Sequence, residues 1–305
     1  MSAPRWPVLS SDASERTWTI GSLVKWATDD FRTRGIENPR LDAEVLVGHA
    51  LGLDRTGVIL SSMRPLEGAE LTQLRALVKR RRTHEPIAYL RGHREFYGRE
   101  FLVDARVLIP RPDTEALIDV ALERTNHVSL STRILDLCTG SGCVAVTLAR
   151  QRPTARVVAT DISEDALTVA RENAYRLGAY NVAFRHGDLF AALEGASRLL
   201  STTFDLVTAN PPYIPSGDIP GLMPDVRDFE PRLALDGGTD GLDLVRRIVE
   251  TAPRYLDVDG VLAMEIGAGE AADTQAILSS AGFRDVAVAR DYGRIERVVS
   301  GIRPA

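Results

Sequence analysis

The first third of the chain has its apolar residues at helical spacing. Leu23, Trp26, Ala27 and Phe31 recur at i, i+3, i+4 and i+8, which places them on one face of a helix. Two further stripes are expected at Leu41, Val45, Leu46, His49 and Leu53, and at Leu66, Leu71, Leu74, Leu77 and Val78. We therefore expect residues 17–82 to form a small bundle of helices.

From residue 86 onward the spacing of the apolar residues is no longer helical. Apolar and polar residues alternate through 96–103 around Gly98, which predicts a β-hairpin. Farther along, short apolar runs alternate with helical stretches, and strands are expected at residues 134–137, 156–160, 182–185, 204–209 and 261–266. This alternation predicts a parallel sheet with helices on both faces.

The end of the chain follows a different pattern. Two last strands, residues 286–289 and 295–299, are separated only by a short turn at 291–293. They must be antiparallel, because a parallel crossover needs a dozen or more residues. The predicted fold class is therefore α/β, with a Rossmann-like, mostly parallel seven-stranded sheet, an antiparallel C-terminal hairpin and a small N-terminal helical domain.

Composition narrows the class of protein. Hydrophobic residues make up 44% and charged residues 26% of the chain, as in ordinary folded domains, and the net charge of −5 argues against a dedicated nucleic-acid binder. No apolar run approaches the roughly 18 residues of a membrane helix, and the first residues lack the apolar core of a signal peptide. Cys138 and Cys143 do not resemble a disulfide framework or a zinc site. We expect a cytoplasmic protein.

The charge is unevenly distributed. Residues 75–106 contain nine Lys or Arg residues and four acidic residues. A solvated surface and a basic patch for an acidic or RNA-associated partner are both compatible with this excess.

The first candidate site follows the first strand of the sheet. Residues 136–145 read DLCTGSGCVA, whose glycines permit a tight turn and close approach of a ligand. With Ala145 the loop formally matches the dinucleotide fingerprint G-x-G-x-x-A, so a dinucleotide fold competes with other nucleoside-binding folds. The candidate ligand-binding residues here are Asp136, Cys138, Thr139, Gly140, Ser141 and Gly142.

Two more acidic residues end the next two strands. Asp161 lies nineteen residues beyond Gly142, where a carboxylate can accept hydrogen bonds from the ribose hydroxyls of NAD or S-adenosylmethionine equally well. Asp188 would face an adenine amino group, with Leu189 or Phe190 against the ring. Three acids at neighbouring strand ends suit a cationic sulfonium better than a pyrophosphate, so we expect S-adenosyl-L-methionine.

The second candidate site is the Asn-Pro-Pro-Tyr sequence at residues 210–213, after the fourth strand. Pro211 and Pro212 have no N–H, so their carbonyls meet no competing donor. The Asn210 side-chain oxygen and the Pro211 carbonyl can accept the two N–H bonds of an amide or aromatic –NH₂ group, and Tyr213 can stack on its plane. Two fixed acceptors would stabilise the positive charge that develops as the nitrogen attacks a methyl group, with no general base needed first. Asn210, Pro211 and Tyr213 are thus the candidate catalytic residues, and Asn210 also borders the cofactor.

These residues resemble a known family over nearly the whole chain. The sequence is similar to the HemK-type protein-(glutamine-N5) methyltransferases, which include the peptide chain release factor glutamine methyltransferases. The matching stretches are PRLDAE at 39–44, PIAYL at 86–90, LIPRPDTE at 108–115, the loop at 136–143, NPPY at 210–213 and EPRLAL at 230–235. The tetrapeptide alone is less specific, because methyltransferases acting on DNA adenine carry close relatives of it.

The resemblance implies methyl transfer from S-adenosyl-L-methionine to the glutamine of the Gly-Gly-Gln motif of class 1 release factors, with no direct nucleic-acid substrate and no membrane partner. It implies that residues 138–142, Asp161 and the position of Leu189 line the cofactor site, and that residues 210–213 bind the glutamine. It also implies that Phe96 and the segment Arg111 to Thr114 close over the cofactor.

We accordingly divide the chain into a helical substrate-recognition domain at residues 1–85, a hairpin linker at 86–110 and a methyltransferase domain at 111–305. One departure from the family pattern is Cys138, which stands where the family loop has its first glycine. Because cysteine is small, we expect the turn to survive.

Other functions remain open from the sequence. The closest is a methyltransferase for a glutamine of a large-subunit ribosomal protein, although the residues between 40 and 90 favour the release-factor enzyme. A DNA or RNA adenine methyltransferase would need a long basic face or a target-recognition domain. An NAD-dependent oxidoreductase leaves the asparagine–proline loop and the terminal hairpin unexplained, and a binding module built on residues 75–106 would bind no cofactor.

Overall fold

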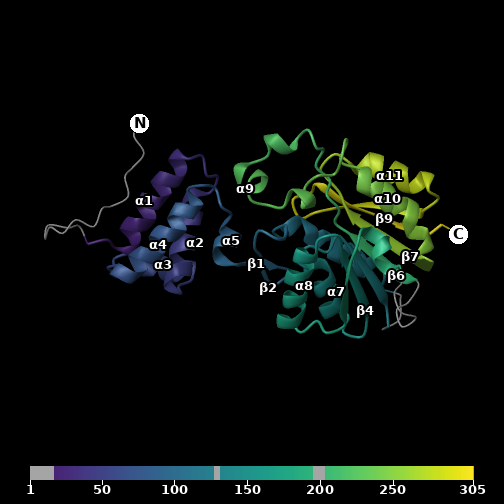
Figure 1. Cartoon of the computed structure of the whole chain (residues 1–305), viewed down its shortest axis with the longest axis horizontal. Helices are drawn as coiled ribbons and strands as arrows, with labels where there is room; N and C mark the ends of the chain where they lie inside the picture. Colours follow the sequence, from purple (N-terminus) through teal and green to yellow (C-terminus); the bar gives the residue numbers. More distant parts are fainter. Residues whose placement is uncertain (1–16, 127–130, 195–202, 305) are drawn as a thin grey trace. The chain divides into compact units, whose positions relative to one another are not determined.

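The structure is a computed structural model that describes residues 17–126, 131–194 and 203–304. The chain divides into two compact units, Met1–Gly92 and His93–Ala305 (Figure 1). The division falls inside the segment 86–110 that we had assigned to a hairpin linker. Across the described ranges, no helix has both the length and the apolar character needed to cross a bilayer.

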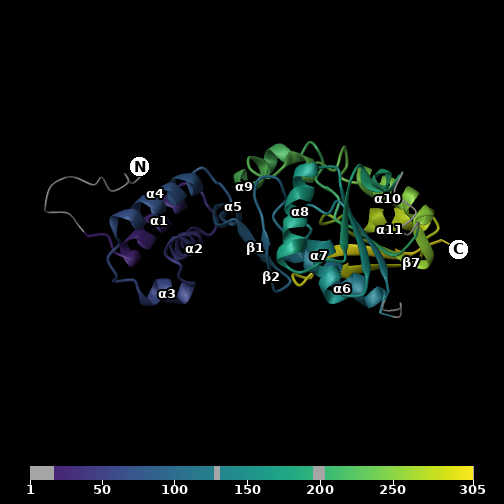
Figure 2. The ribbon, with the colours of Figure 1, turned by 60° about the horizontal axis from the view of Figure 1, so that its bottom comes forward.

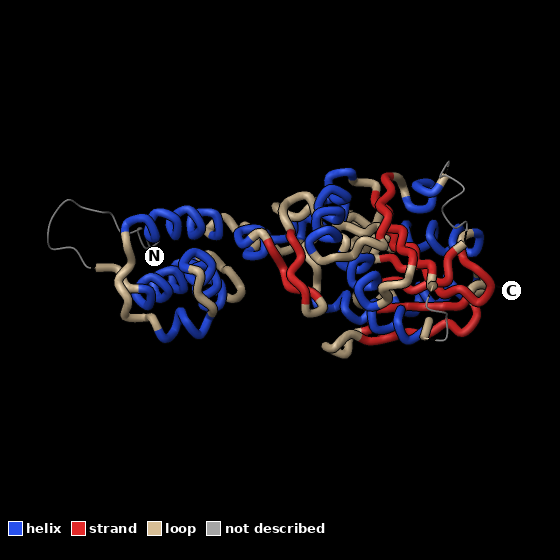
Figure 3. The backbone as a smooth tube through the Cα atoms, turned by 90° about the horizontal axis from the view of Figure 1, so that it is seen from below, coloured by secondary structure: helices blue, strands red, loops and turns tan. Residues whose placement is uncertain are grey.

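The first unit is helical, as the apolar stripes predicted. Its elements are α1 (Ile20–Thr33), α2 (Pro39–Leu51), α3 (Arg55–Leu60), α4 (Gly68–Arg81) and α5 (Ile87–Arg91). Figure 3 shows these helices in blue, joined by short loops. Thr19 begins α1 with a capping box, in which its side chain and that of Ser22 each accept a backbone N–H. Phe31, Leu46 and Leu74 are completely buried between the helices.

The buried face of α2 differs from the predicted stripe. Leu41 is 43% exposed and His49 is exposed, whereas Asp42 and Glu44 are buried. Arg81 Nε lies 2.8 Å from Asp42 Oδ2, and two arginines of the same unit hold the carboxylate of Glu44. A buried charge is tolerated when it is paired, so ion pairs take the place of apolar contacts on part of this face. The predicted stripe is right at Leu46 and wrong at Leu41 and His49.

Several arginines of the basic segment 75–106 have acidic partners. The ion pairs are Arg80–Glu85, Arg81–Asp42, Arg82–Asp30 and Arg106–Asp104. These four pairs reduce the positive charge that the segment can offer to a partner.

The second unit begins with the predicted hairpin. Strands β1 (His93–Phe96) and β2 (Arg99–Leu102) pair antiparallel, with Phe96 opposite Arg99. The two residues between the strands, Tyr97 and Gly98, have φ values of 51° and 71°. Positive φ at both central positions is the geometry of a tight two-residue hairpin turn, and glycine adopts it without steric cost.

A seven-stranded sheet forms the centre of this unit and confirms the predicted fold class. Its strands are β3 (Arg133–Leu137), β4 (Arg156–Asp161), β5 (Val182–His186), β6 (Phe204–Ala209), β7 (Leu256–Glu265), β8 (Arg284–Arg290) and β9 (Glu296–Ile302). They follow the order β5-β4-β3-β6-β7-β9-β8, and only the pairs that contain β9 are antiparallel. This is the parallel sheet with an antiparallel end that the short turn at 291–293 predicted.

Helices cover both faces of the sheet (Figures 1 and 2). On one face α6 (Glu115–Arg124), α7 (Cys143–Gln151) and α8 (Glu164–Arg176) pack on side chains such as Ile134. On the other, α10 (Asp243–Thr251) and α11 (Ala271–Ser280) pack on side chains such as Leu135 and Leu137. The alternation along β3 therefore divides the core into two layers.

Short helices complete the unit. They are α9 (Pro224–Arg227), η1 (Pro112–Thr114), η2 (Leu189–Leu193), η3 (Ile219–Gly221), η4 (Arg232–Ala234) and η5 (Ala252–Arg254).

The strand order places the site. It reverses between β3 and β6, so the loops after these two strands leave the sheet in opposite directions, and ligands bind at such a switch point. Leu137 and Ala209, the last residues of the two strands, are paired in register. Cys138 and Asn210, one residue further on, therefore begin the two candidate loops side by side.

Candidate functional site

A cavity of about 400 Å³ opens at the carboxyl ends of the parallel strands of the second unit. This volume suits a nucleoside-sized ligand. The predicted site residues that line it are Arg111, Asp136, Cys138, Thr139, Gly140, Ser141, Asp161, Asp188, Leu189, Asn210 and Pro212. The lining does not include four other predicted residues, Phe96, Gly142, Pro211 and Tyr213.

The glycine-rich loop passes from β3 into α7 through backbone turns. Gly142 has a φ of 81° and caps α7, and a Cβ on it would lie 3.1 Å from the Cβ of Ala170. Glycine therefore allows α7 and α8 to approach each other behind the cavity. Gly142 lies behind the loop, where α7 packs against α8, and is therefore not among the residues that line the cavity.

Cys138 takes a left-handed backbone conformation. Its φ is 55°, in the region where glycine is at ease and an L-residue costs roughly 1–2 kcal/mol. The turn has formed with cysteine in place of the family's glycine, as expected, but with a strained residue at the cavity wall.

Asp136 is fully buried at the end of β3. Its Oδ2 accepts a hydrogen bond from Thr139 Oγ1 at 2.6 Å, and its Oδ1 accepts one from Thr208 Oγ1 of β6 at 2.8 Å. Burial raises the pKa of Asp136 to about 7, although these hydrogen bonds favour its charged form. Asp136 thus fastens the glycine-rich loop to the neighbouring strand that carries Asn210.

Asp161 ends β4 and is held by backbone donors. Gly140 N donates to its Oδ2 at 2.8 Å, and Ser163 N donates to its Oδ1 at 2.9 Å. Burial raises the pKa of this carboxyl, and the backbone hydrogen bonds oppose that rise. The carboxylate is oriented before any ligand binds, and each oxygen keeps a lone pair for a ligand hydroxyl.

Asp188 and Leu189 form the far wall of the cavity. Asp188 Oδ2 accepts a hydrogen bond from Arg247 Nη2 of α10 at 2.6 Å, so this carboxylate is not the isolated acceptor that the sequence suggested. Leu189 lines the cavity, whereas Phe190 stacks on Tyr255 in the core with ring centroids 4.8 Å apart. Of the two residues expected against the adenine ring, Leu189 is the one at the cavity.

Phe96 and Arg111, expected to close over the cofactor, lie in different surroundings. Phe96 is 1% exposed and packs edge-on against Phe101, with ring centroids 5.9 Å apart. The structure does not bring its ring to the cavity, because the inward face of β1 directs it into the core. Arg111 does line the cavity, and its Nη2 donates to Oε1 of Glu230 at 2.6 Å.

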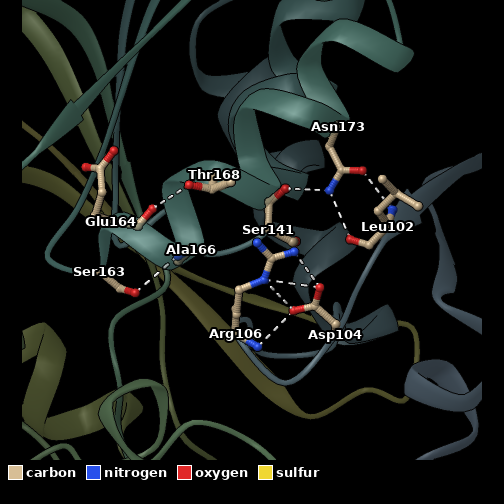
Figure 4. A network of polar contacts seen from close by, with 9 residues as sticks. All are labelled: Leu102, Asp104, Arg106, Ser141, Ser163, Glu164, Ala166, Thr168 and Asn173. Atoms are coloured by element: carbon tan, nitrogen blue, oxygen red, sulfur yellow. Dashed lines mark hydrogen bonds and ion pairs between the residues drawn. The ribbon is translucent and has the colours of Figure 1, made fainter.

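The hairpin is tied to the glycine-rich loop through Asn173 of α8 (Figure 4). Its Oδ1 accepts from Leu102 N at 2.7 Å, and its Nδ2 donates to Leu102 O at 3.0 Å and to Ser141 O at 2.9 Å. Figure 4 also shows Arg106, a lining residue, held by Asp104 beside this network. Asn173 therefore fixes one edge of the cavity by hydrogen bonds to backbone atoms.

The loop after β6 is braced by a second chain segment. Ile214 N donates to Leu235 O at 3.0 Å, and Gly237 N donates to Ile214 O at 2.8 Å. A Cβ on Gly237 would lie 2.8 Å from the Pro212 carbonyl oxygen, so only glycine permits this approach. The prolines and the bracing segment hold the backbone after Asn210 in one path.

Asn210 itself lines the cavity and is held by its amide group. Its Nδ2 donates to Thr114 Oγ1 of η1 at 3.3 Å. Pro211 is buried next to it, and Tyr213 is partly buried. Burial raises the pKa of Tyr213 to about 12, so its phenol is neutral at physiological pH.

Sequence reasoning missed three charged residues at this site: Arg247, Glu230 and Glu265. Glu265 ends β7 and is buried, at the position beside Asn210 in the register of β6 and β7. Burial raises the pKa of Glu265 to about 7. The one visible signal was an acidic residue inside the apolar run 261–266. Nothing in the sequence linked Arg247 to Asp188 or Glu230 to Arg111.

Comparison with known proteins gives the class of each part of the chain. The family model described as a methyltransferase domain matches residues 129–265, and the model of the PrmC N-terminal domain matches residues 22–92. The second unit is therefore a methyltransferase domain.

Relatives along the whole chain define the family. The release factor glutamine methyltransferase of Geobacter sulfurreducens is 45% identical over 284 residues, which cover 93% of this chain and 96% of that protein. The enzyme of the same name from Chlorobaculum tepidum is 42% identical, over 94% of this chain and 98% of its own. This chain belongs to the release factor glutamine methyltransferase family. A solved protein-(glutamine-N5) methyltransferase from Alicyclobacillus acidocaldarius matches 65% of this chain and 95% of its own with 26% identity and a TM-score of 0.40.

S-adenosyl-L-methionine is the cofactor of this enzyme class, and the residues present fit it. Asp161 offers oriented carboxylate oxygens to ribose hydroxyls, and Leu189 and Ile162 offer apolar contact to a base.

Proposed function

We propose that this chain transfers a methyl group from S-adenosyl-L-methionine to the side-chain amide nitrogen of the glutamine in the Gly-Gly-Gln motif of class 1 release factors. The observation that carries the proposal is the hydrogen bond from Asn210 Nδ2 to Thr114 at the cavity wall. With its –NH₂ group engaged there, the Asn210 amide keeps its oxygen for a substrate N–H. The names of the full-length relatives support the substrate class.

The substrate amide is proposed to bind in the loop after β6. Asn210 Oδ1 accepts one N–H bond of the glutamine and the Pro211 carbonyl accepts the other, while Pro212 and Tyr213 support the plane of the group. An amide nitrogen is a weak nucleophile, because its lone pair is delocalised into the carbonyl. Two fixed acceptors stabilise the positive charge that grows on it during attack.

The cofactor is proposed to occupy the cavity over the ends of β3, β4 and β5. When bound, it supplies an electrophilic methyl group on a sulfonium. Asp161 binds the ribose, Asp188 and Leu189 bind the adenine, and residues 138–141 contact the rest of the molecule, with Asp136 and Gly142 holding that loop in place.

In the proposed step a nitrogen–carbon bond forms and the methyl–sulfur bond breaks. The methylated nitrogen then loses one of its two protons to solvent, and the acceptors at Asn210 and Pro211 hold it until then. No residue has to remove a proton before the attack, because the lone pair of a neutral amide is the nucleophile. The protein contributes by orienting the substrate amide and by stabilising the positive charge that develops on its nitrogen. In this proposal no nucleic acid is a substrate.

The test uses labelled S-adenosyl-L-methionine and three acceptors: a class 1 release factor, the same factor with its motif glutamine changed to glutamate, and a large-subunit ribosomal protein with a methylatable glutamine. We expect label on the unaltered release factor alone. Equal labelling of the two release factors would refute the proposed target residue. Stronger labelling of the ribosomal protein would assign the chain to that substrate instead.

A further inference from the structure

Arg297 of β9 is a largely buried arginine that the proposed mechanism does not use. Its side chain is 11% exposed, and its Nη2 lies 3.4 Å from Asp113 Oδ2 of η1. Its Nε donates to Asp291 Oδ2 at 3.3 Å, and its Nη1 donates to Ile266 O at 3.4 Å. Because a guanidinium stays charged and has several donors in a fixed plane, this one side chain can hold three segments in place.

The strand order explains why η1 meets Arg297. β7 lies between β6 and β9, and Ile266 N, just after β7, donates to Arg297 O at 2.9 Å. Asn210 directly follows β6, so it lies at the same edge of the sheet as Arg297, on the other side of β7. The helix η1 reaches both residues, through Thr114 and Asp113. It therefore crosses the ends of three neighbouring strands.

The position of η1 depends on side-chain contacts. It has only three residues, too few for a helix to be stable by itself. Glu115 continues the chain into α6 on one side. On the other side, Arg111 Nη2 donates at 2.6 Å to Oε1 of Glu230, whose side chain is 2% exposed. The ion pair between Asp113 and Arg297 adds a tie at the middle residue of η1.

The contact between η1 and Asn210 is sensitive to small displacements. Thr114 Oγ1 accepts from Asn210 Nδ2 at 3.3 Å, which is long for an N–H···O hydrogen bond. An outward shift of η1 by a few tenths of an ångström would break this bond. Thr114 is 2% exposed, so bulk water does not readily replace the lost partner. The position of η1 therefore decides whether the Asn210 amide is held.

We propose that Arg297 is a positioning residue for methyl transfer. Through Asp113 it holds η1 where Thr114 can fix the side-chain amide of Asn210. The inference rests on the proposed function, in which Asn210 Oδ1 accepts a substrate N–H. It assigns a role to an arginine that does not line the cavity. The side chain of Asp113 is 47% exposed, so the ion pair is only partly desolvated and we expect a moderate effect on the rate.

The test is a double-mutant cycle of Arg297→Gln and Thr114→Val, with methyl transfer to a class 1 release factor as the readout. Each single variant should lower kcat/KM by on the order of fivefold, which corresponds to the loss of one hydrogen bond. The double variant should lose no more than either single variant, because both changes release the same Asn210 amide. The cofactor Kd, measured by calorimetry, should stay at its wild-type value.

The control is Arg290→Gln, a matched change at an arginine of β8 whose side chain is 62% exposed. It should leave kcat/KM unchanged. If Arg297→Gln does not fold, Asp113→Ala removes the same ion pair from its more exposed side and should give the same loss, with no further loss in the Thr114→Val background. Losses that multiply in the double variant, or a wild-type rate in Arg297→Gln, would overturn the inference.

A second readout needs no substrate. The side-chain amide NMR signals of Asn210 should shift in the same direction in Arg297→Gln and Thr114→Val, and should keep their wild-type positions in Arg290→Gln. Shifted signals without any methyl transfer by wild type would refute the proposed function alone. Asn210 signals that do not move in folded Arg297→Gln would refute the role of Arg297.

Discussion

The two sides of the cavity are held in place by different kinds of group. On the cofactor side, at the ends of β3 to β5, Asp161 is held by the backbone N–H groups of Gly140 and Ser163. On the substrate side, after β6, Asn210 is held by the side-chain hydroxyl of Thr114. Backbone N–H groups are fixed by the path of the main chain, whereas Asn210 depends on a single side-chain hydroxyl. The cofactor side is therefore oriented by the main chain, and the substrate side by a contact between side chains.

The largest change in stability is expected at Phe96. This residue tests whether a side chain on the cofactor side supports the fold or contacts the cofactor. Phe96→Ala should lower the free energy of unfolding by about 3–5 kcal/mol, because it empties a buried site against Phe101. Cofactor affinity of the folded fraction should stay close to wild type. Urea unfolding and calorimetry with S-adenosyl-L-methionine measure the two quantities, and Phe96→Leu is the milder control. Lost affinity at unchanged stability would place Phe96 over the cofactor after all.

Asn210→Ala tests the substrate side directly. Removing one of two acceptors of a developing charge should lower the rate of methyl transfer by on the order of 100-fold or more. The cofactor Kd should change little, because the contacts of Asp161 remain. Single-turnover kinetics and calorimetry separate the two effects. If cofactor affinity collapsed instead, Asn210 would belong to the cofactor side.

Asp136→Asn addresses the buried acid that joins the two sides. Burial raises the folded-state pKa of Asp136 to about 7 from 3.8, so the folded protein keeps a proton that the unfolded chain has lost. Wild type should therefore lose stability relative to Asp136→Asn as the pH rises from 5 to 7, by on the order of 1–2 kcal/mol. Urea unfolding of both proteins across this range measures the difference. Parallel stability curves would mean that Asp136 titrates normally.

Cys138 offers the smallest effect, on the backbone of the cofactor side. Cys138→Gly should raise the free energy of unfolding by about 1 kcal/mol, because glycine adopts a φ of 55° without the penalty of a Cβ. Cys138→Ala keeps the Cβ and removes the thiol, so it should bring no gain. Equal stabilisation by both variants would assign the effect to the thiol and remove the argument from backbone strain.

The elements that the sequence predicted correctly are those whose signal is local. Apolar runs and the short turn at 291–293 were enough for the sheet, and the two loops after β3 and β6 could be placed side by side from strand order alone. The stripe on α2 was wrong at Leu41 and His49, because partners distant in the sequence, such as Arg81 for Asp42, allow carboxylates to be buried on that helix. Local periodicity contains no information about such pairs.

The predictions for the site divide in the same way, between residues with a local signal and residues whose partners are distant in the sequence. Asp161 and Asn210 were visible because Asp161 is the last residue of β4 and Asn210 directly follows β6, and both line the cavity. Arg247 is 59 residues from its partner Asp188, and Glu230 is 119 residues from its partner Arg111. Phe96 was placed by resemblance, whereas the direction of its ring was set by the strand alternation of β1.

The most direct test of the account is to locate the methyl group on the product. A class 1 release factor is incubated with this protein and S-adenosyl-L-methionine at pH 8, digested and mapped by fragment mass spectrometry. The account predicts one methyl group on the side-chain nitrogen of the Gly-Gly-Gln glutamine, absent with Asn210→Ala. A methyl group on any other residue, or no transfer by a protein that binds the cofactor, would contradict it.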